Sequence, residues 1–145
     1  MNTVAGGQTY VIEARFDKAL KLIRNALEKR ELSIAGEMDL TESFAKDSGK
    51  ESEPSKLLLV DCPLLLFEAL ALDRAAAVFF PLHVLVSADG ERTQVVCVEP
   101  ATLFEVRLPV GAAHPLEELR NRIGMALESL LSRSESHCDQ QAREI

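Results

Sequence analysis

The stretch that decides the fold runs from Leu57 to Pro100 and reads LLLVDCPLLLFEALALDRAAAVFFPLHVLVSADGERTQVVCVEP. It contains, in order, an apolar run, a Cys-Pro break, a second apolar segment, a Phe-Phe-Pro corner and two apolar runs joined by Asp-Gly. Apolar runs bounded by turn residues are typical of strands, and Asp-Gly between two such runs is a strong hairpin signal. We therefore expect a strand, a helix and a β-hairpin in succession.

The rest of the chain extends this pattern on both sides. Hydrophobic periodicity predicts, in order, a strand at Thr9–Ala14, a helix at Phe16–Leu27, strands at Glu31–Gly36 and Lys56–Val60, a helix at Pro63–Leu72, strands at Val78–Val86 and Thr93–Val98, and a helix at Pro115–Leu131. This β-α-β-β-α-β-β-α order predicts an α+β fold with an antiparallel or mixed sheet and helices mainly on one face. We expect a single domain over residues 1–131 and a frayed polar tail over residues 132–145.

The predicted hairpin sets which side chains face one another. A turn centred on Asp89-Gly90 would place Leu82 opposite Cys97. Because side chains alternate along a strand, His83 and Cys97 should point to opposite faces of the sheet. This geometry argues against a metal site that they share.

Composition excludes several classes of protein. The chain has 145 residues, is 47% hydrophobic and carries a formal net charge of −7. Excess negative charge argues against binding to nucleic acid or to an anionic membrane surface, because both depend on Lys and Arg. No secretory signal and no apolar run of bilayer length is visible, and the three cysteines form no CxxC pair. We expect a soluble cytoplasmic protein with reduced thiols and without a cofactor or a metal.

The helix predicted at Pro63–Leu72 is apolar on all sides except at Glu68. Its first helical position is Pro63, with Cys62 or Asp61 as the N-cap. A helix that is apolar all round cannot face water on one side. Either it is sandwiched inside its own domain or a second copy covers its outer face, and the small size of the chain favours the second alternative, a homodimer.

The segment Met38–Ser55 is rich in Ser, Asp, Glu and Lys and contains Gly49 and Pro54. A loop of this length inside a compact domain is usually either a mobile insertion or a lid. Leu40 and Phe44 are the residues that would close it over a groove.

Three side chains could carry acid–base chemistry. Asp61 lies at the start of an apolar helix, where a carboxylate can act simply as a cap. Glu68 could be buried with a raised pKa, or it could point to solvent or pair with a nearby arginine, for which Arg74 is a candidate. His83 could bind a ligand or shuttle protons, or it could be an ordinary surface histidine. Each residue type has a structural explanation that needs no function. No phosphate-binding loop, G-x-S-x-G, H-E-x-x-H or nucleotide fingerprint occurs.

The stretch also resembles an uncharacterised bacterial family, domain of unknown function 302 (DUF302). The matching residues are Asp61-Cys62-Pro63, Glu68-Ala69-Leu70, Phe80-Pro81-Leu82 and Glu99-Pro100. The resemblance covers most of residues 9–131 and implies a TATA-binding-protein-like fold that is commonly dimeric, with no implication of DNA binding. This chain has Asp61 and Leu82 where the family has cysteines, so no thiol or metal role is carried over.

These observations lead to one main hypothesis and one alternative. The main hypothesis is a non-enzymatic domain that forms a homodimer and binds a small, mainly apolar ligand. The candidate ligand-binding residues are Asp61, Phe79, Phe80, His83 and, from the lid, Phe44. The alternative is an enzyme that uses Asp61, Glu68 and His83 as acid and base groups, which requires these side chains to converge.

Overall fold

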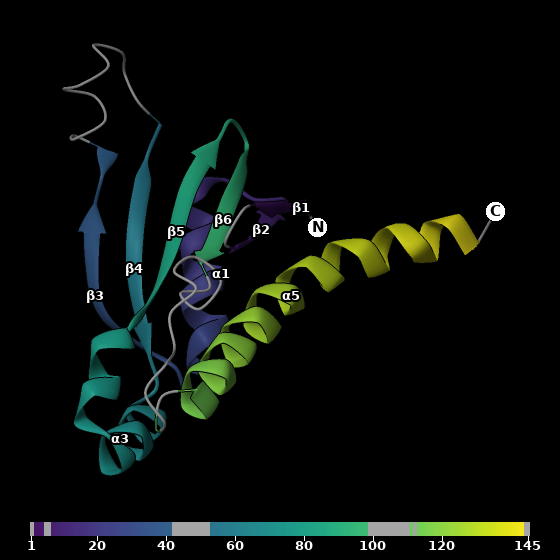
Figure 1. Ribbon diagram of the computed structural model, residues 1–145. Helices are drawn as coiled ribbons and strands as arrows, with labels where there is room; N and C mark the ends of the chain where they lie inside the picture. The colour runs from purple at the N-terminus through teal and green to yellow at the C-terminus, as the bar shows by residue number, and fades with distance from the viewer. Residues whose placement is uncertain (1, 5–6, 42–52, 99–110, 112, 144–145) are drawn as a thin grey trace.

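The computed structural model describes residues 2–4, 7–41, 53–98, 111 and 113–143, with side chains for 8–41, 53–97, 111 and 113–131. Its elements are β1 (Asn2–Val4), β2 (Gly7–Ile12), α1 (Phe16–Glu28), β3 (Ser33–Asp39), β4 (Ser55–Asp61), α3 (Pro63–Leu72), the 3-10 helix η1 (Arg74–Phe79), β5 (Leu82–Asp89), β6 (Arg92–Val98) and α5 (Ala113–Arg143) (Figure 1). The predicted β-α-β-β-α-β-β-α order and the α+β class are confirmed. The short strand β1 and the helix η1 are additions that the sequence pattern did not predict.

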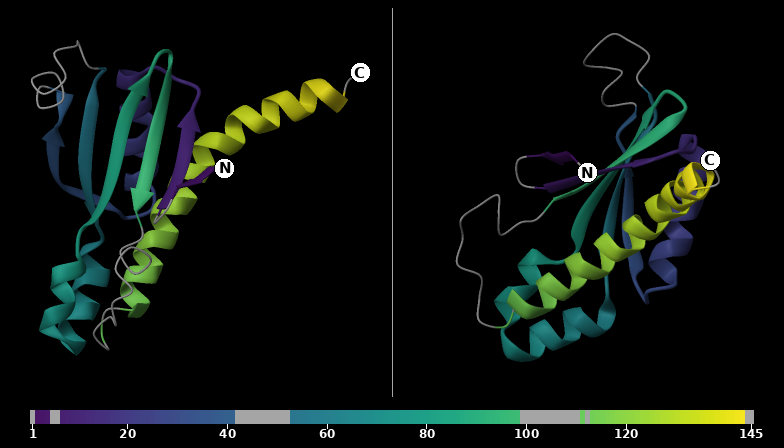
Figure 2. Two further views of the ribbon diagram at one scale, coloured as in Figure 1. Left: turned by 45° about the horizontal axis from the view of Figure 1, so that its top comes forward. Right: turned by 90° about the vertical axis from the view of Figure 1, so that its right-hand side faces the viewer.

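The strands form one antiparallel sheet in the order β1-β2-β6-β5-β4-β3. Every neighbouring pair in this sheet is antiparallel. Strands β2 and β3 follow one another in the chain around α1, yet β6, β5 and β4 lie between them in the sheet. Helix α1 therefore carries the chain from one side of the sheet to the other (Figure 2).

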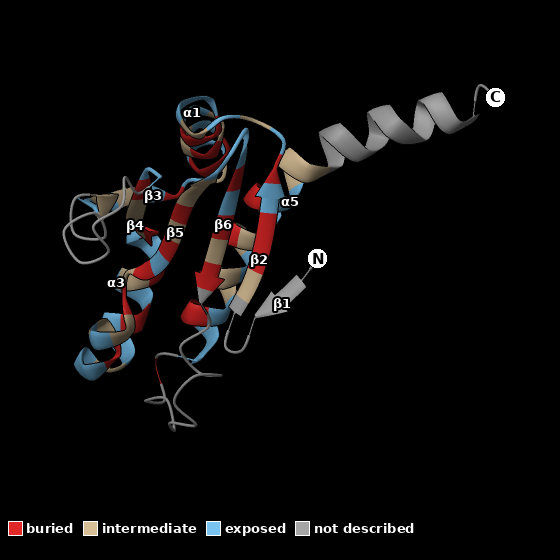
Figure 3. Ribbon diagram, turned by 90° about the horizontal axis from the view of Figure 1, so that it is seen from above, coloured by how far each residue is buried: buried red, intermediate tan, exposed pale blue. Residues whose placement is uncertain are grey.

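One face of the sheet forms the core, because α1 and α5 pack against each other and against this face. Strand residues alternate between the two faces, and those on the helix side are buried. They are Tyr10, Ile12, Leu58, Val60, Leu82, Val84, Val86, Val95 and Cys97. The alternation of buried and more exposed positions along the strands is visible in Figure 3.

Helix α1 agrees with its predicted span and buries one stripe, which includes Ile23 and Leu27. Its other side is tied to the sheet by charge, since the Arg24 guanidinium forms an ion pair with Glu37 on β3. Lys56 of β4 lies 3.9 Å from the same carboxylate. The Arg24 hydrogen bond is the main reason why the pKa of Glu37 is lowered.

The entry to β5 differs from the prediction of a strand at Val78–Val86. Val78 and Phe79 belong to η1, and the strand begins only at Leu82. The Asp73 side chain accepts a hydrogen bond from the Ala75 N–H at 2.9 Å and so caps the start of η1. β-Propensity misassigned the first two residues because this local cap and the run of alanines favour a helical turn.

The predicted hairpin register is wrong by two residues. Asp89 pairs with Arg92, so the turn residues are Gly90 and Glu91, and Cys97 lies opposite Val84 instead of Leu82. Gly90 has a φ of 63°, which is the conformation that glycine tolerates best. A shift of two residues preserves the faces, so the prediction that His83 and Cys97 point to opposite sides is confirmed.

Helix α5 continues as helical backbone to Arg143, through the residues for which the sequence predicted a frayed tail. The apolar stripe of a helix indicates only the part that packs against the core. The helical backbone can continue beyond this stripe, which is why the predicted tail and the observed helix differ. No helix in the described part of the chain combines the length and the hydrophobicity needed to cross a membrane. Most of the predicted insertion, including Phe44, lies outside the described residues.

Candidate functional site

The sheet face opposite α1 and α5, called here the outer face, carries no helix among the residues that the structure describes (Figure 2). The strand register defines its members, which are Thr9, Val11, Leu57, Leu59, His83, Leu85, Gln94 and Val96. Leu57 lies opposite Leu85, which is in turn opposite Val96. The outer face is therefore an apolar strip that crosses three strands, and its leucines are only partly buried.

Asp61 ends β4 on this outer face, two residues after Leu59. It is 8% exposed, and its Oδ1 accepts a hydrogen bond from the Cys62 backbone N–H at 2.7 Å. Burial raises the pKa of the Asp61 carboxyl, and this hydrogen bond only partly opposes the rise. The N-cap of α3 is Cys62, without a side-chain capping bond, so Asp61 does not cap the helix in the expected way.

His83 lies beside Asp61 on the outer face. It pairs directly with Leu59, which makes Asp61 its diagonal neighbour across β4 and β5. Diagonal neighbours in a sheet are roughly 7–8 Å apart, so the two groups could be bridged by one polar atom of a bound molecule. The His83 side chain is exposed, in contrast to the buried Asp61.

The two phenylalanines of the predicted site differ in their surroundings. Phe80 is 8% exposed and belongs to the core, while Phe79 is partly buried and packs against it. Phe79 ends η1, and Phe80 and Pro81 then lead into β5 immediately before His83. The remaining candidate, Phe44, lies outside the described residues. Both phenylalanines lie near the β4–β5 end of the sheet, but Phe80 belongs to the core on the helix side, whereas Asp61 and His83 lie on the outer face.

Glu68 is not part of this group. Its side chain is 51% exposed, and Oε1 lies 4.0 Å from Nδ1 of His114 at the start of α5. The sequence suggested Arg74 as a candidate partner, but helix α5 instead brings His114 beside α3. Asp61 and His83 share the outer face, whereas Glu68 belongs to a separate contact between helices.

One polar contact near the site was not predicted from the sequence. Arg122 of α5 donates to the Cys62 Sγ at 3.6 Å and to Glu118 Oε1 at 3.1 Å. Cys62 is buried, so this contact joins α5 to the start of α3 directly behind Asp61. Nothing in the helical pattern of residues 115–131 distinguishes Arg122 from other charged positions on α5, which is why it was not found.

A second notable surface lies on α3 and η1, which extend beyond one end of the strands (Figure 1). Helix α3 buries only Leu65 and Ala69, and the outward side chains are large and apolar. We call this the α3–η1 patch; the most exposed members are Leu64 at 71%, Phe67 at 72%, Leu72 at 69% and Val78 at 82%. Clustered exposed apolar side chains of this kind usually mark an interaction surface.

The described residues contain no cluster of three or more His, Cys, Asp or Glu side chains that could hold a metal ion. The chemistry available on the outer face is therefore an apolar surface that ends in one imidazole and one carboxyl group of raised pKa. Such an arrangement suits a largely apolar molecule with a single polar end.

The fold and this surface define the class of protein: an α+β domain whose antiparallel sheet has helices on one face. The sequence pattern of the family described as "Domain of unknown function DUF302" matches residues 8–130, so the chain belongs to this family. The chain is also similar to the crystal structure of an uncharacterized conserved DUF302 protein from Bacillus stearothermophilus, with a TM-score of 0.73 at 14% identity over 86% of this chain and 98% of that one. At this identity the likeness establishes the fold alone. No curated protein matches the chain.

Proposed function

We propose that this protein is a non-enzymatic, cytoplasmic domain that forms a homodimer and binds a small, mainly apolar molecule. The observation that carries the proposal is the α3–η1 patch, where four large apolar side chains are each about 70% exposed or more. The interface is formed by this patch, and the ligand site by the outer face near His83.

A second copy is the occupant that suits the patch best. A twofold axis lets one self-complementary apolar surface cover itself, so no separate partner is needed. The net charge of −7 opposes association of two copies at long range, and a patch poor in charge limits this repulsion at the contact. Glu68, the acidic residue of α3, lies within 4.0 Å of His114, which places a positive charge beside it when the imidazole is protonated.

The ligand part of the proposal rests on the outer face. Leu57, Leu59 and Leu85 form an apolar floor, and Asp61 and His83 supply hydrogen-bonding groups at one end of it. Apolar sites with few polar groups at fixed positions are the usual form of small-molecule sites. Phe79 lies next to this end and can extend the apolar contact.

The dimer is tested by light scattering coupled to size-exclusion chromatography on Phe67→Asp and Leu64→Asp. Both variants should elute as monomers where the unmodified protein is a dimer, because each buries an unpaired charge in the interface. Met125→Asp is the matched control, since Met125 is an exposed apolar residue at 53% on α5. A stable monomer for the unmodified protein, or a dimer that survives both patch substitutions, rejects the proposal.

The ligand site is tested with Nile red, a neutral apolar dye whose fluorescence rises on binding. Leu85→Asp should abolish the rise and His83→Ala should weaken it, while Met125→Asp should leave it unchanged. Phe67→Asp separates the two surfaces: dye binding that disappears with Phe67→Asp and persists with Leu85→Asp would place the dye on the α3–η1 patch and contradict the outer-face site.

A further inference from the structure

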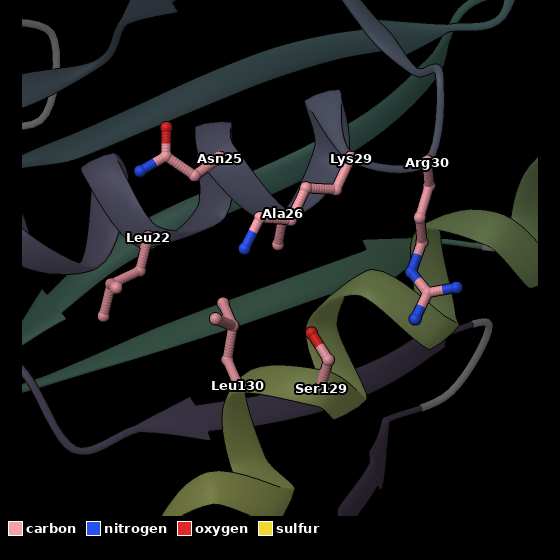
Figure 4. A pocket seen from close by; sticks show the side chains of 7 residues that line it. All are labelled: Leu22, Asn25, Ala26, Lys29, Arg30, Ser129 and Leu130. Carbon is pink, nitrogen blue, oxygen red and sulfur yellow. The ribbon is translucent and has the colours of Figure 1, made fainter.

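A cavity lies on the helix side of the molecule, between the C-terminal half of α1 and the middle of α5 (Figure 4). Its volume is about 390 Å³, which is within the range of roughly 300–1,000 Å³ typical of small-molecule sites. It shares no residue with the outer face or with the α3–η1 patch, so its function is independent of the function proposed above.

The residues that line this cavity form an apolar part and a polar, positively charged part. Leu22 and Ala26 from α1 and Leu130 from α5 form an apolar part. Lys29 and Arg30 supply positive charge at the end of α1, and Asn25 and Ser129 add polar groups. Figure 4 shows the Arg30 side chain reaching toward α5, while the Lys29 side chain runs back along α1 toward Ala26, and Ser129 and Leu130 point from α5 toward α1. Positive charge and apolar surface therefore meet in one cavity.

Among the described residues, Lys29 and Arg30 form no ion pair with a carboxylate, and the same is true of Lys18 and Lys21 on α1. Arg24, Arg92 and Arg122 each lie within ion-pair distance of a carboxylate. Within the described residues, no carboxylate lies within 4.0 Å of the Lys29 or Arg30 side chain. What distinguishes Lys29 and Arg30 is that they line the α1–α5 cavity, whose lining residues include no carboxylate.

Capping of α1 does not explain the two cations. The backbone N–H of Lys29 donates to the Asn25 carbonyl at 3.1 Å, and that of Arg30 donates to the Leu27 carbonyl at 3.0 Å. The Leu32 N–H also donates to the Leu27 carbonyl, at 3.1 Å. The carbonyls of Asn25, Leu27 and Glu28 thus have backbone partners, and the side chains of Lys29 and Arg30 remain available to a ligand.

We propose that the α1–α5 cavity binds a small amphipathic anion, an acid group on a short apolar chain. Lys29 and Arg30 hold the acid group, with the guanidinium able to bind two of its oxygens at once. The chain of the ligand lies against Leu22, Ala26 and Leu130. A charge-only site would not need these apolar residues, and an apolar site would not place two cations at its edge.

The test compares octanoate, octyl phosphate, octanol and inorganic phosphate in titrations followed by backbone amide NMR of the full chain. We expect octanoate or octyl phosphate to shift the amides of residues 22–30 and 129–130, with octanol and inorganic phosphate binding at least about tenfold more weakly. Whichever of the two anions binds more tightly identifies the head group as a carboxylate or a phosphate ester.

The variant Lys29→Ala/Arg30→Ala should weaken binding of the amphipathic anion by at least about tenfold. Lys18→Ala/Lys21→Ala is its matched control, because it removes the same charge from exposed positions on the same helix. An equal loss in both variants would mean general electrostatic attraction and would overturn the proposal. So would octanol or inorganic phosphate binding as tightly as the anions, or no binding of either anion at millimolar concentration.

Discussion

Burial of the Asp61 carboxyl group disfavours its charged form. The carboxyl group is buried at the end of β4, and its one described hydrogen bond comes from the Cys62 N–H. Because burial raises its pKa, the folded state holds the proton more tightly than the unfolded chain does. Between the ordinary pKa of 3.8 and the raised folded value, stability falls as the pH increases. Above the raised pKa, the ionised Asp61 therefore lowers the free energy of unfolding relative to its value below pH 3.8.

Asp61→Asn should raise the free energy of unfolding at pH 7, because the amide keeps an acceptor for Cys62 N–H and removes the buried charge. The gain should shrink as the pH falls through the raised pKa of Asp61, because the carboxyl group then takes up its proton. Urea denaturation at several pH values measures this effect. Asp89→Asn, at an exposed position, is the control. A loss of stability at pH 7 would instead support Asp61 as a partner of the α3 dipole.

Two buried threonines in the sheet should respond differently to substitution by valine. Thr93 is fully buried, and its Oγ1 donates to the Ala14 carbonyl at 2.8 Å. Thr9 is also buried, but its Oγ1 has no hydrogen-bond partner among the described residues. Thr93→Val should cost about 1–2 kcal/mol, whereas Thr9→Val should be neutral or stabilising. Thermal and urea denaturation of both variants measure the difference, and equal losses would contradict it.

At the scale of elements, two glycines have opposite roles. Gly90 has a φ of 63° in the hairpin turn, and a Cβ there would meet nothing within 4 Å. The cost of Gly90→Ala is therefore one of backbone conformation, about 1–2 kcal/mol. Gly124 lies inside helix α5, and its Cβ would approach Tyr10 OH at 3.5 Å, an ordinary contact.

Gly124→Ala should stabilise the protein by up to about 1 kcal/mol, because alanine is the better helix former, while Gly90→Ala destabilises it. Circular dichroism melts of the two variants, which add the same methyl group, provide the comparison. If Gly90→Ala were neutral, the turn would have to adopt a conformation with negative φ at residue 90.

The sequence predicted elements best where one physical signal dominates. Helix α1 has a regular apolar stripe, and α3 begins at a proline, so both spans were close to correct. The start of β5 was wrong because the Asp73 cap competes with β-propensity. The hairpin register was wrong because Asp-Gly indicates a turn without fixing which two residues occupy it.

Sites were harder to predict than elements, because they depend on which elements become neighbours. Asp61 and His83 share a face through strand pairing of β4 with β5, which alternation alone could suggest. The pairing of Glu68 with His114 and the cavity at Lys29 and Arg30 require the packing of α5 against α3 and α1. No local pattern contains that information.

At the scale of the whole molecule, the net negative charge disfavours self-association, whereas the exposed apolar surface favours it. With a net charge of −7 on each copy, added salt screens repulsion between the proposed subunits. The dimer dissociation constant should therefore fall as NaCl is raised from about 0.05 to about 0.5 M, as measured by sedimentation equilibrium. A rise with salt would mean that ion pairs, and not the α3–η1 patch, hold the copies together.

The position of β2 in the sheet has a consequence for folding kinetics. Strands β3, β4, β5 and β6 pair with their neighbours in the chain, but β2 pairs with β6, as in Tyr10 with Val95. Closing that long loop costs entropy that the other ladders do not pay, so β2 should join the sheet last. Pulse-labelled hydrogen exchange should show the amides of β4 and β5 protected before those of β2. A nascent chain would expose the backbone groups of β2 until β6 has left the ribosome, which makes β2 the segment most open to mispairing or chaperone capture.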